Sequence, residues 1–317
     1  MDIGAGITFG AGVSIEAAPT GSGNKAIFGY GAIYSGAWIG LSMTNLISNL
    51  GIVGNDVTGV GTGRGGLAAA GYGTDKAIFV YGTTNMGIDG VVSMSNKVSN
   101  TGVVAGDTTG VGTARTFLAA ACYGTDKAIF GYGYLNANPP FVSMTNLVSN
   151  TGVVATDTTG VGTARYELAA ASYGTDKAIF GYGFGNIVEY TAITNKVSNT
   201  GVVASDTTGV GSPRSTPGAA GYGNDKAMFA FGYNGGTGGF KSMTNLVSNT
   251  GVVATDTSTV ATGRFALPCA TYGTDKAILG PGSGGYVTNL VSNTGVVASD
   301  VTGVGTDRSR QAGAAYG

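Results

Sequence analysis

One pattern recurs six times along this chain, about every fifty residues. Each copy holds an Asp/Asn-Lys-Ala segment, a stretch of variable length, an Asn-x-Val/Ile-Ser-Asn segment and an arginine. A period of this length indicates repeat units that are too small to fold alone and that stack on one another. The lysines are Lys25, Lys76, Lys127, Lys177, Lys226 and Lys276, and the arginines are Arg64, Arg115, Arg165, Arg214, Arg264 and Arg308.

Short strand patterns divide each unit, as residues 165–213 illustrate. We expect strands at 168–173, 177–182, 193–197 and 202–204, because these runs are short, rich in small, β-branched or aromatic residues, and bounded by Gly, Asn or Asp. No segment shows a helical pattern. Four antiparallel strands in each of six units predict an all-β fold, a six-bladed β-propeller with its blades around a central channel. The strand rich in Ala and Gly is expected to be the innermost.

The two ends of the chain each carry part of one unit, so we expect the C-terminal strand to complete the N-terminal blade and close the ring. Residues 1–20 lie outside the repeat and are interpreted either as a strap on the ring or as an attachment segment for a partner or a second subunit, which would make the protein a homo-oligomer. The predicted propeller is 21–317, with blades at 308–317 plus 21–63, 64–114, 115–164, 165–213, 214–263 and 264–307.

The unit resembles the kelch-type propeller repeat. Arg165 opens the unit, small residues at 169–171 follow, and the second strand holds the run 179–183, Ile-Phe-Gly-Tyr-Gly, where the family has a Gly-Gly pair. The turn Asn199-Thr200-Gly201 precedes the fourth strand, and the family's late Trp is absent. The near-identity of neighbouring copies is also similar to repeat proteins of aquatic phage virions, some of which belong to tail or adsorption structures. This resemblance implies contact with a host surface or with another virion protein.

Differences among the copies fall in two places. The distance from the lysine to the Thr or Ser of the third strand varies from 12 to 19 residues, and substitutions gather there and just after each arginine. In an up-and-down blade both connections emerge on one face, where loops on a rigid frame often bind partners. We expect a recognition surface that stacks on sugars or anchors a protein; the alternative is drift, with aromatic side chains capping the blade ends. The candidate residues are Tyr34, Trp38, Phe117, Tyr134, Phe141, Tyr166, Phe184, Tyr190, Tyr233, Phe240, Phe265 and Tyr286.

Composition argues against most chemistry. The chain has no histidine and a net charge of −1, which excludes His-based nucleophile systems and gives no electrostatic signal for nucleic acid. Each Asp-Thr-Thr-Gly segment offers one carboxylate, too few for calcium. Arg165, Tyr166 and Glu167 are adjacent, but an arginine occurs there in every unit and favours a scaffold tie to carbonyls or to the Asp eight residues earlier. We predict no enzyme, metal or cofactor, and we expect Cys122 and Cys269 to be reduced core residues.

The start of the chain lacks the basic region of a secretory signal, so we expect synthesis in the cytosol and association with a virion. No run reaches the ~18 apolar residues that span a bilayer, so membrane insertion is not expected. The predicted function is a non-enzymatic interaction module, a phage tail fibre or adsorption component that binds a host-surface glycan or another virion protein through the variable face. The alternatives are a free-standing sugar-binding lectin and an intracellular kelch-like scaffold. The invariant turns of the opposite face could dock a symmetric partner.

Overall fold

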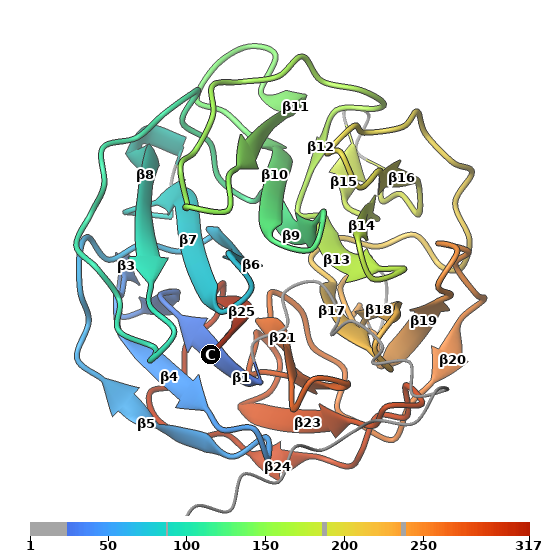
Figure 1. Cartoon of the computed structure of the whole chain (residues 1–317). Coiled ribbons are helices and arrows are strands. Elements are labelled where there is room, and N and C mark those ends of the chain that lie inside the picture. Colours follow the sequence, from blue (N-terminus) through green and yellow to red (C-terminus); the bar gives the residue numbers. More distant parts are fainter. Residues whose placement is uncertain (1–23, 87, 186–188, 236–238) are drawn as a thin grey trace, which may run out of the picture.

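The protein is all-β in the part of the chain that the structure describes. This computed structural model describes residues 24–86, 88–185, 189–235 and 239–317, so the predicted strap at 1–20 lies outside the described residues. Small antiparallel sheets surround a common centre (Figure 1). The described residues form no α-helix, and their short 3-10 turn η1 covers Ile88–Gly90. Within these ranges, no helix has the length and apolar character needed to cross a membrane.

Each repeat unit forms one sheet of three or four strands. The first sheet joins both ends of the chain, in the order β25 (Ala312–Tyr316), β1 (Lys25–Gly29), β4 (Thr44–Ile47) and β5 (Val53–Val57). The next two sheets are β6 (Ala68–Tyr72), β7 (Lys76–Thr83) and β8 (Val91–Val98), and β9 (Ala119–Tyr123), β10 (Lys127–Tyr134) and β11 (Phe141–Val148). The fourth sheet is β13 (Ala169–Tyr173), β14 (Lys177–Gly181) and β16 (Thr194–Val197).

The remaining sheets follow the same order. The fifth is β17 (Gly218–Tyr222), β18 (Lys226–Ala230), β19 (Met243–Val247) and β20 (Thr257–Ser258). The sixth is β21 (Cys269–Tyr272), β22 (Lys276–Leu279), β23 (Val287–Val291) and β24 (Val301–Thr302). Two small ribbons belong to the variable loops: β2 (Ala32–Tyr34) with β3 (Trp38–Gly40), and β12 (Arg165–Tyr166) with β15 (Phe184–Gly185).

The innermost strands contact one another in sequence, from β25 to β6, β9, β13, β17 and β21, and β21 in turn contacts β25. These strands consist largely of Ala and Gly, which lets six backbones approach the centre. The two chain ends meet in the first sheet, where Lys25 lies opposite Tyr316 and the Asn24 N–H donates to the Gly317 carbonyl at 2.8 Å. The C-terminal strand therefore supplies the inner strand of the first unit.

The fourth strand differs from the prediction. Residues 202–204 form only a single bridge, between Val197 and Val203, and a fourth strand is present only in the sheets that contain β5, β20 and β24. The prediction of four strands per unit is thus wrong for the other three sheets. In this segment the Ala204 N–H donates to the Lys196 carbonyl at 2.8 Å, and Asn195 Nδ2 donates to the Ala204 carbonyl at 3.0 Å, a bond that recurs in the four-stranded sheets.

The hydrophobic core lies between neighbouring sheets. One cluster joins Ile129 and Tyr132 of one unit to Phe180 and Val197 of the next, all buried, and the rings of Tyr132 and Phe180 are 5.1 Å apart. Burying each such side chain contributes about 1.5–3 kcal/mol. Because each sheet buries its faces against two neighbours, the stability of a unit depends on the units on either side.

Candidate functional site

A buried arginine in each unit fixes the base of the variable loops. Arg115 is fully buried and donates to the carbonyl of Tyr132 (2.8 Å), to the carbonyl of Thr113 (3.0 Å) and to Asn146 Oδ1 (2.6 Å). Its guanidinium lies over the ring of Tyr81, 4.8 Å from the centroid, in the preceding sheet. Burial lowers the pKa of Arg115, and nearby Tyr81 and Asp157 act in the opposite direction. The carbonyl contacts match the scaffold role expected for these arginines.

The carboxylate partner of each arginine is not the one that sequence spacing suggested. Asp107, eight residues before Arg115, instead lies 4.0 Å from Arg64, whereas Arg115 has Asp157 at 3.6 Å. The reason is that the chain crosses to the next sheet between Asp107 and Arg115. Burial acts to raise the pKa of Asp157, but hydrogen bonds from Thr113 and the Asn of the third strand hold it below its usual value.

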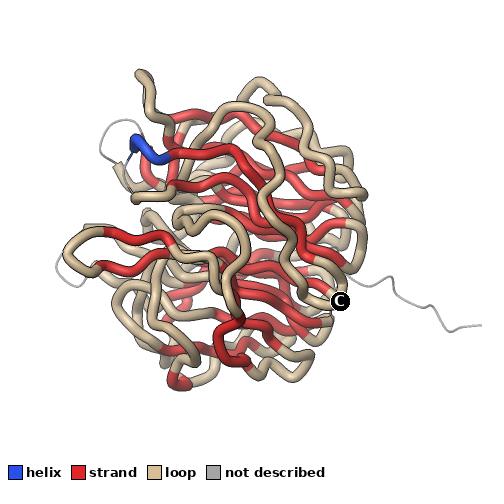
Figure 2. Tube along the Cα trace, turned by 90° about the vertical axis from the view of Figure 1, so that its left-hand side faces the viewer, coloured by secondary structure: helices blue, strands red, loops and turns tan. Residues whose placement is uncertain are grey.

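The variable connections share one face, as predicted from loop lengths. The 3-10 turn and the looped ribbons project on the side away from the C-terminus of the chain (Figure 2). Nine of the twelve predicted aromatic residues form a continuous set of ring contacts, and the Tyr34–Trp38 pair joins this set through the Arg310 guanidinium, which lies over both Trp38 and Phe117. We call these eleven residues the aromatic belt. Its members are Tyr34, Trp38, Phe117, Tyr134, Phe141, Tyr166, Phe184, Tyr190, Tyr233, Phe240 and Phe265.

Ring contacts carry the belt from unit to unit. Tyr166 is its hub, because it stacks on Phe141 (5.0 Å, 7° between planes) and meets Phe184 edge-on at 5.7 Å. The belt continues through Tyr190 to Tyr233, whose centroids are 6.2 Å apart. Most of its rings are half-buried, whereas Tyr34, Trp38 and Phe240 are exposed. Such contacts stabilise aromatic pairs by about 0.5–1.5 kcal/mol beyond burial, so the loops hold a preformed surface.

Tyr286 is the one predicted site residue outside the belt. Its ring contacts no other ring among the described residues, and its hydroxyl donates to the Gly305 carbonyl. Its loop is the shortest of the six, with 12 residues from Lys276 to Thr288. A loop of this length does not carry its aromatic residue onto the belt, and the role of Tyr286 as a binding residue stays a prediction.

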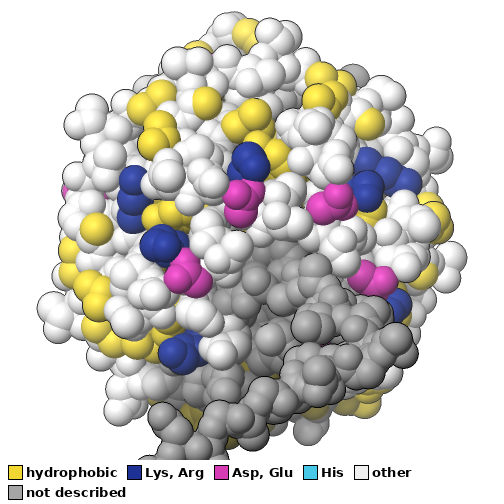
Figure 3. Space-filling view, in the orientation of Figure 1, with side chains coloured by type: hydrophobic (Ala, Val, Ile, Leu, Met, Phe, Trp, Pro, Cys, Tyr) yellow, Lys and Arg dark blue, Asp and Glu magenta, His cyan; other side chains and the backbone are white. Residues whose placement is uncertain are grey.

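The opposite face is regular and carries charge. Acidic and basic side chains lie in adjacent pairs on this face (Figure 3). In the turns between the first and second strands, Asp126 pairs with Lys127 at 2.7 Å and Asp176 with Lys177 at 2.9 Å. An apolar side chain also stands exposed after the Gly of each turn between the third and fourth strands. These six equivalent residues are 60 to 66% exposed: Ile52, Val103, Val153, Val202, Val252 and Val296.

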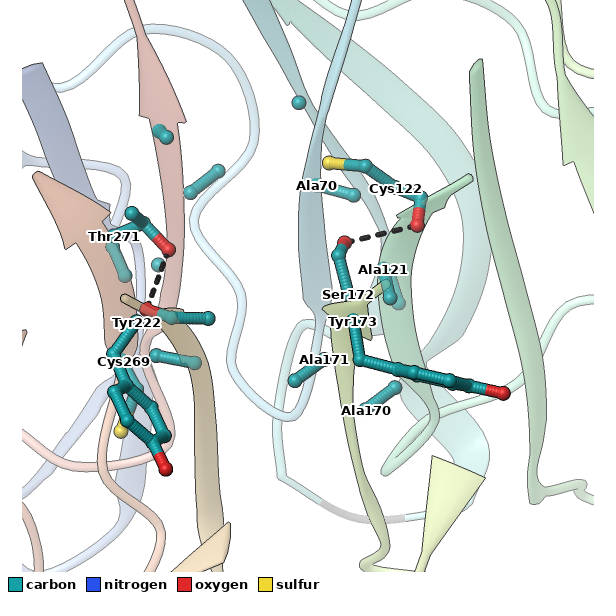
Figure 4. Close-up of a pocket in the computed structure, with 18 of the residues that line it drawn as sticks. Ala70, Ala121, Cys122, Ala170, Ala171, Ser172, Tyr173, Tyr222, Cys269 and Thr271 are labelled. Atoms are coloured by element: carbon teal, nitrogen blue, oxygen red, sulfur yellow. Dashed lines mark hydrogen bonds between the residues drawn. The ribbon is translucent and has the colours of Figure 1, made fainter. Parts of the chain in front are cut away.

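A narrow channel runs along the centre, lined by the innermost strands. Its part toward the regular face encloses about 70 Å³. There Ser172 donates to the Cys122 carbonyl at 2.9 Å and Thr271 donates to the Gly221 carbonyl at 3.0 Å (Figure 4). Cys122 and Cys269 are free and buried, and burial raises their thiol pKa values to about 11 and about 12. Both thiols therefore stay protonated at neutral pH, as expected of packing residues.

A circle of backbone hydrogen bonds surrounds the channel mouth on the belt side. The residue two places after each arginine has a positive φ, between 48° and 62°, and its N–H donates to the carbonyl of the equivalent residue in the preceding unit. The donor–acceptor pairs are Phe117 to Gly66 (2.7 Å), Glu167 to Phe117 (2.9 Å), Thr216 to Glu167 (2.6 Å), Ala266 to Thr216 (3.1 Å), Arg310 to Ala266 (2.9 Å) and Gly66 to Arg310 (3.1 Å).

These six residues form the part of the site that our sequence prediction missed, apart from Phe117. The available signal was that the copies differ two residues after each arginine, where one unit has Glu167 and another has Arg310. Only the circular arrangement brings them to one mouth.

No set of three Cys, Asp or Glu side chains suited to a metal ion occurs within the described ranges. No protein-family model and no curated protein sequence matches this chain.

Proposed function

We propose that the chain is a six-bladed β-propeller that acts as a non-catalytic recognition module and binds glycans through the aromatic belt. Three observations support the propeller: six consecutive sheets, a cycle of contacts among their inner strands, and the circle of six backbone hydrogen bonds at the channel mouth. In this arrangement β25 closes the ring by completing the first blade.

The aromatic belt is the observation that carries the binding role. Monomeric proteins rarely expose a contiguous apolar surface unless it contacts a ligand or partner. The rings combine an apolar face with the tyrosine hydroxyls, which suits the mixed apolar and hydroxyl surface of a sugar. The regular turns of the opposite face vary little among units, so they offer less scope for selecting one ligand.

We extend the proposal to a phage tail fibre or adsorption component whose belt contacts a host-surface glycan. This part rests on the similarity of the near-identical copies to virion repeat proteins. A free-standing lectin would use the same belt without a particle. Co-sedimentation of the full chain with purified particles distinguishes the two.

The belt is tested by screening the full chain on immobilised glycans, with Tyr34→Ala and Phe240→Ala as variants because both side chains are exposed. Each is expected to weaken binding of the selected glycan by about tenfold, in line with the loss of an aromatic contact. The matched control is Val153→Ser on the opposite face, which should bind like the unchanged protein. Retention of full binding by both belt variants would contradict the proposal.

A protein partner is a second candidate, favoured by the ring of six equivalent exposed apolar residues on the opposite face. A repeated surface of this kind suits another virion protein that presents the same contact several times. Replacing Val153 and Val202 by Asp should then abolish capture of that protein while leaving glycan binding intact. Capture that survives both changes would eliminate this candidate.

A further inference from the structure

The channel mouth on the belt side is a second cavity, and it contains charge. It encloses about 130 Å³, and its walls are mainly apolar, from residues such as Leu118 and Leu168. The charged and hydroxyl-bearing side chains there are Glu167, Thr216 and Arg310, and the Gln311 amide that also lines the cavity donates to the Arg308 carbonyl. The backbone of the surrounding circle is already paired with itself, so a ligand would have to be recognised by these side chains.

Arg310 has hydrogen-bonding capacity to spare. Its guanidinium lies between two aromatic rings, 4.9 Å from the Phe117 centroid and 5.4 Å from that of Trp38. No guanidinium hydrogen bond or ion pair joins Arg310 to another described residue, unlike Arg115 and its equivalents. Stacking fixes the plane of the guanidinium but leaves its N–H donors available, and this planar fork matches a carboxylate.

Glu167 and Thr216 complete the polar set. Glu167 is three places from Arg310 in the circle of six, on the opposite side of the mouth, and the two are attracted without forming a direct ion pair. Burial raises the pKa of Glu167, although the Ser215 hydroxyl favours its charged form. The Thr216 hydroxyl oxygen is buried without a hydrogen-bond partner. Buried polar atoms are rarely left unpaired, so this oxygen points to a ligand or water.

We propose that the channel mouth binds the carboxylate end of an acidic sugar. Arg310 receives the carboxylate, Thr216 and Glu167 hydrogen-bond to hydroxyl groups, and Phe117 contacts an apolar face of the ring. The cavity is close to the size of an engineered cavity of about 150 Å³ that holds benzene, so it takes one end of one sugar. The next sugar of a chain would then lie on the belt beside Tyr166. This inference rests on the proposed glycan-binding function.

The test compares binding of galacturonate with that of neutral galactose by NMR titration of the full chain. Galacturonate is expected to bind and galactose to bind at least tenfold more weakly. Arg310→Gln should weaken galacturonate binding about tenfold or more, because it removes a charge-assisted hydrogen bond. Thr216→Val, which keeps the side-chain shape, and Glu167→Gln should each weaken it severalfold. Lys76→Gln on the opposite face is the matched control and should have no effect.

Equal binding of the two sugars, or full binding by Arg310→Gln, would overturn the inference. Glycine and serine serve as a separate arm, and binding of these amino acids without binding of galacturonate would also overturn it. If thermal melting shows that Arg310→Gln does not fold, the result for Thr216→Val is used instead, and full galacturonate binding by that variant would overturn the inference. If galacturonate and galactose bind equally but glycan binding is still weakened by Phe240→Ala, only the site at the channel mouth is rejected. Glycan binding insensitive to both Tyr34→Ala and Phe240→Ala would reject the proposed function itself.

Discussion

The buried arginines are the residues on which each unit depends most. A guanidinium taken out of water is costly unless all its donors are paired, and Arg115 pairs with two carbonyls and an amide while stacking on Tyr81. Removing the charge would leave the Asn146 oxygen and a carbonyl buried without donors. The same position therefore serves as a scaffold in all six units, even where neighbouring residues diverge.

Replacing Arg115 by Met is expected to lower the free energy of unfolding by about 3–5 kcal/mol, because it breaks a buried network and leaves its acceptors unpaired. Urea denaturation followed by tyrosine fluorescence measures this change. Lys127→Met is the matched control, since Lys127 forms only a half-exposed pair with Asp126 and should change stability by less than about 1 kcal/mol. Similar effects of the two substitutions would show that the arginine network is not central.

The outer part of each sheet is an element held by side chains more than by its backbone. Asn146 of β11 donates to the Ala155 carbonyl at 3.0 Å and to Asp157 at 2.9 Å. Asp157 also accepts from Thr113, which precedes β9, the inner strand of the same sheet. One Asn and one Asp thus hold, by hydrogen bonds, both the segment after the third strand of the unit and the linker that leads into its inner strand. The same bonds recur in the sheets with a fourth strand, for example from Asn245 to Ala254 and Asp256.

This fastening makes stability sensitive to acid. Hydrogen bonds hold the pKa of Asp157 and its equivalents below the usual value, so the stabilisation is present above the unfolded pKa of about 3.9 and is lost as pH falls through the lower folded pKa. We expect the melting temperature to drop below about pH 4. Asp157→Asn should be less stable than the unchanged protein at pH 6, and the difference should shrink at pH 2. A constant difference across this range would contradict the assignment.

In the proposed propeller, closure of the ring would distribute stability over all six units. The inner strands contact one another in a cycle, and the circle of hydrogen bonds at the mouth links the same six units again. No unit in such an arrangement has an uncovered face. The place where the chain begins and ends should then matter little for stability, provided that β25 remains paired with β1.

A circular permutant tests this closure. Joining Gly317 to Met1 and opening the chain between Asn136 and Ala137, which are exposed between β10 and β11, should leave a folded protein within about 2 kcal/mol of the original. Opening the chain between Ala170 and Ala171, inside the inner strand β13, should prevent folding. Circular dichroism and gel filtration distinguish the outcomes. An unfolded first permutant would argue for an open array.

Much of the candidate site could be predicted because it follows from comparing copies within the chain. Variable loop length predicted which face would carry the aromatic residues, and eleven of twelve joined the belt. Tyr286 lies outside the belt, because its loop has only 12 residues from Lys276 to Thr288 and sequence comparison does not show how far so short a loop reaches. Glu167 was dismissed with its neighbouring arginine, since adjacency in sequence concealed that the two side chains serve different networks.

The repeat, the inner three strands of each unit and the repeated arginine can be predicted from local patterns, because periodicity, small residues and turn glycines act over a few residues. The pairing of each Asp with its Arg, and the position of Glu167 and Arg310 on opposite sides of one mouth, depend on the folded arrangement of the units. These contacts join residues of different units. They depend on how each sheet is placed against the next, which is set by packing of apolar faces and has no counterpart in local spacing.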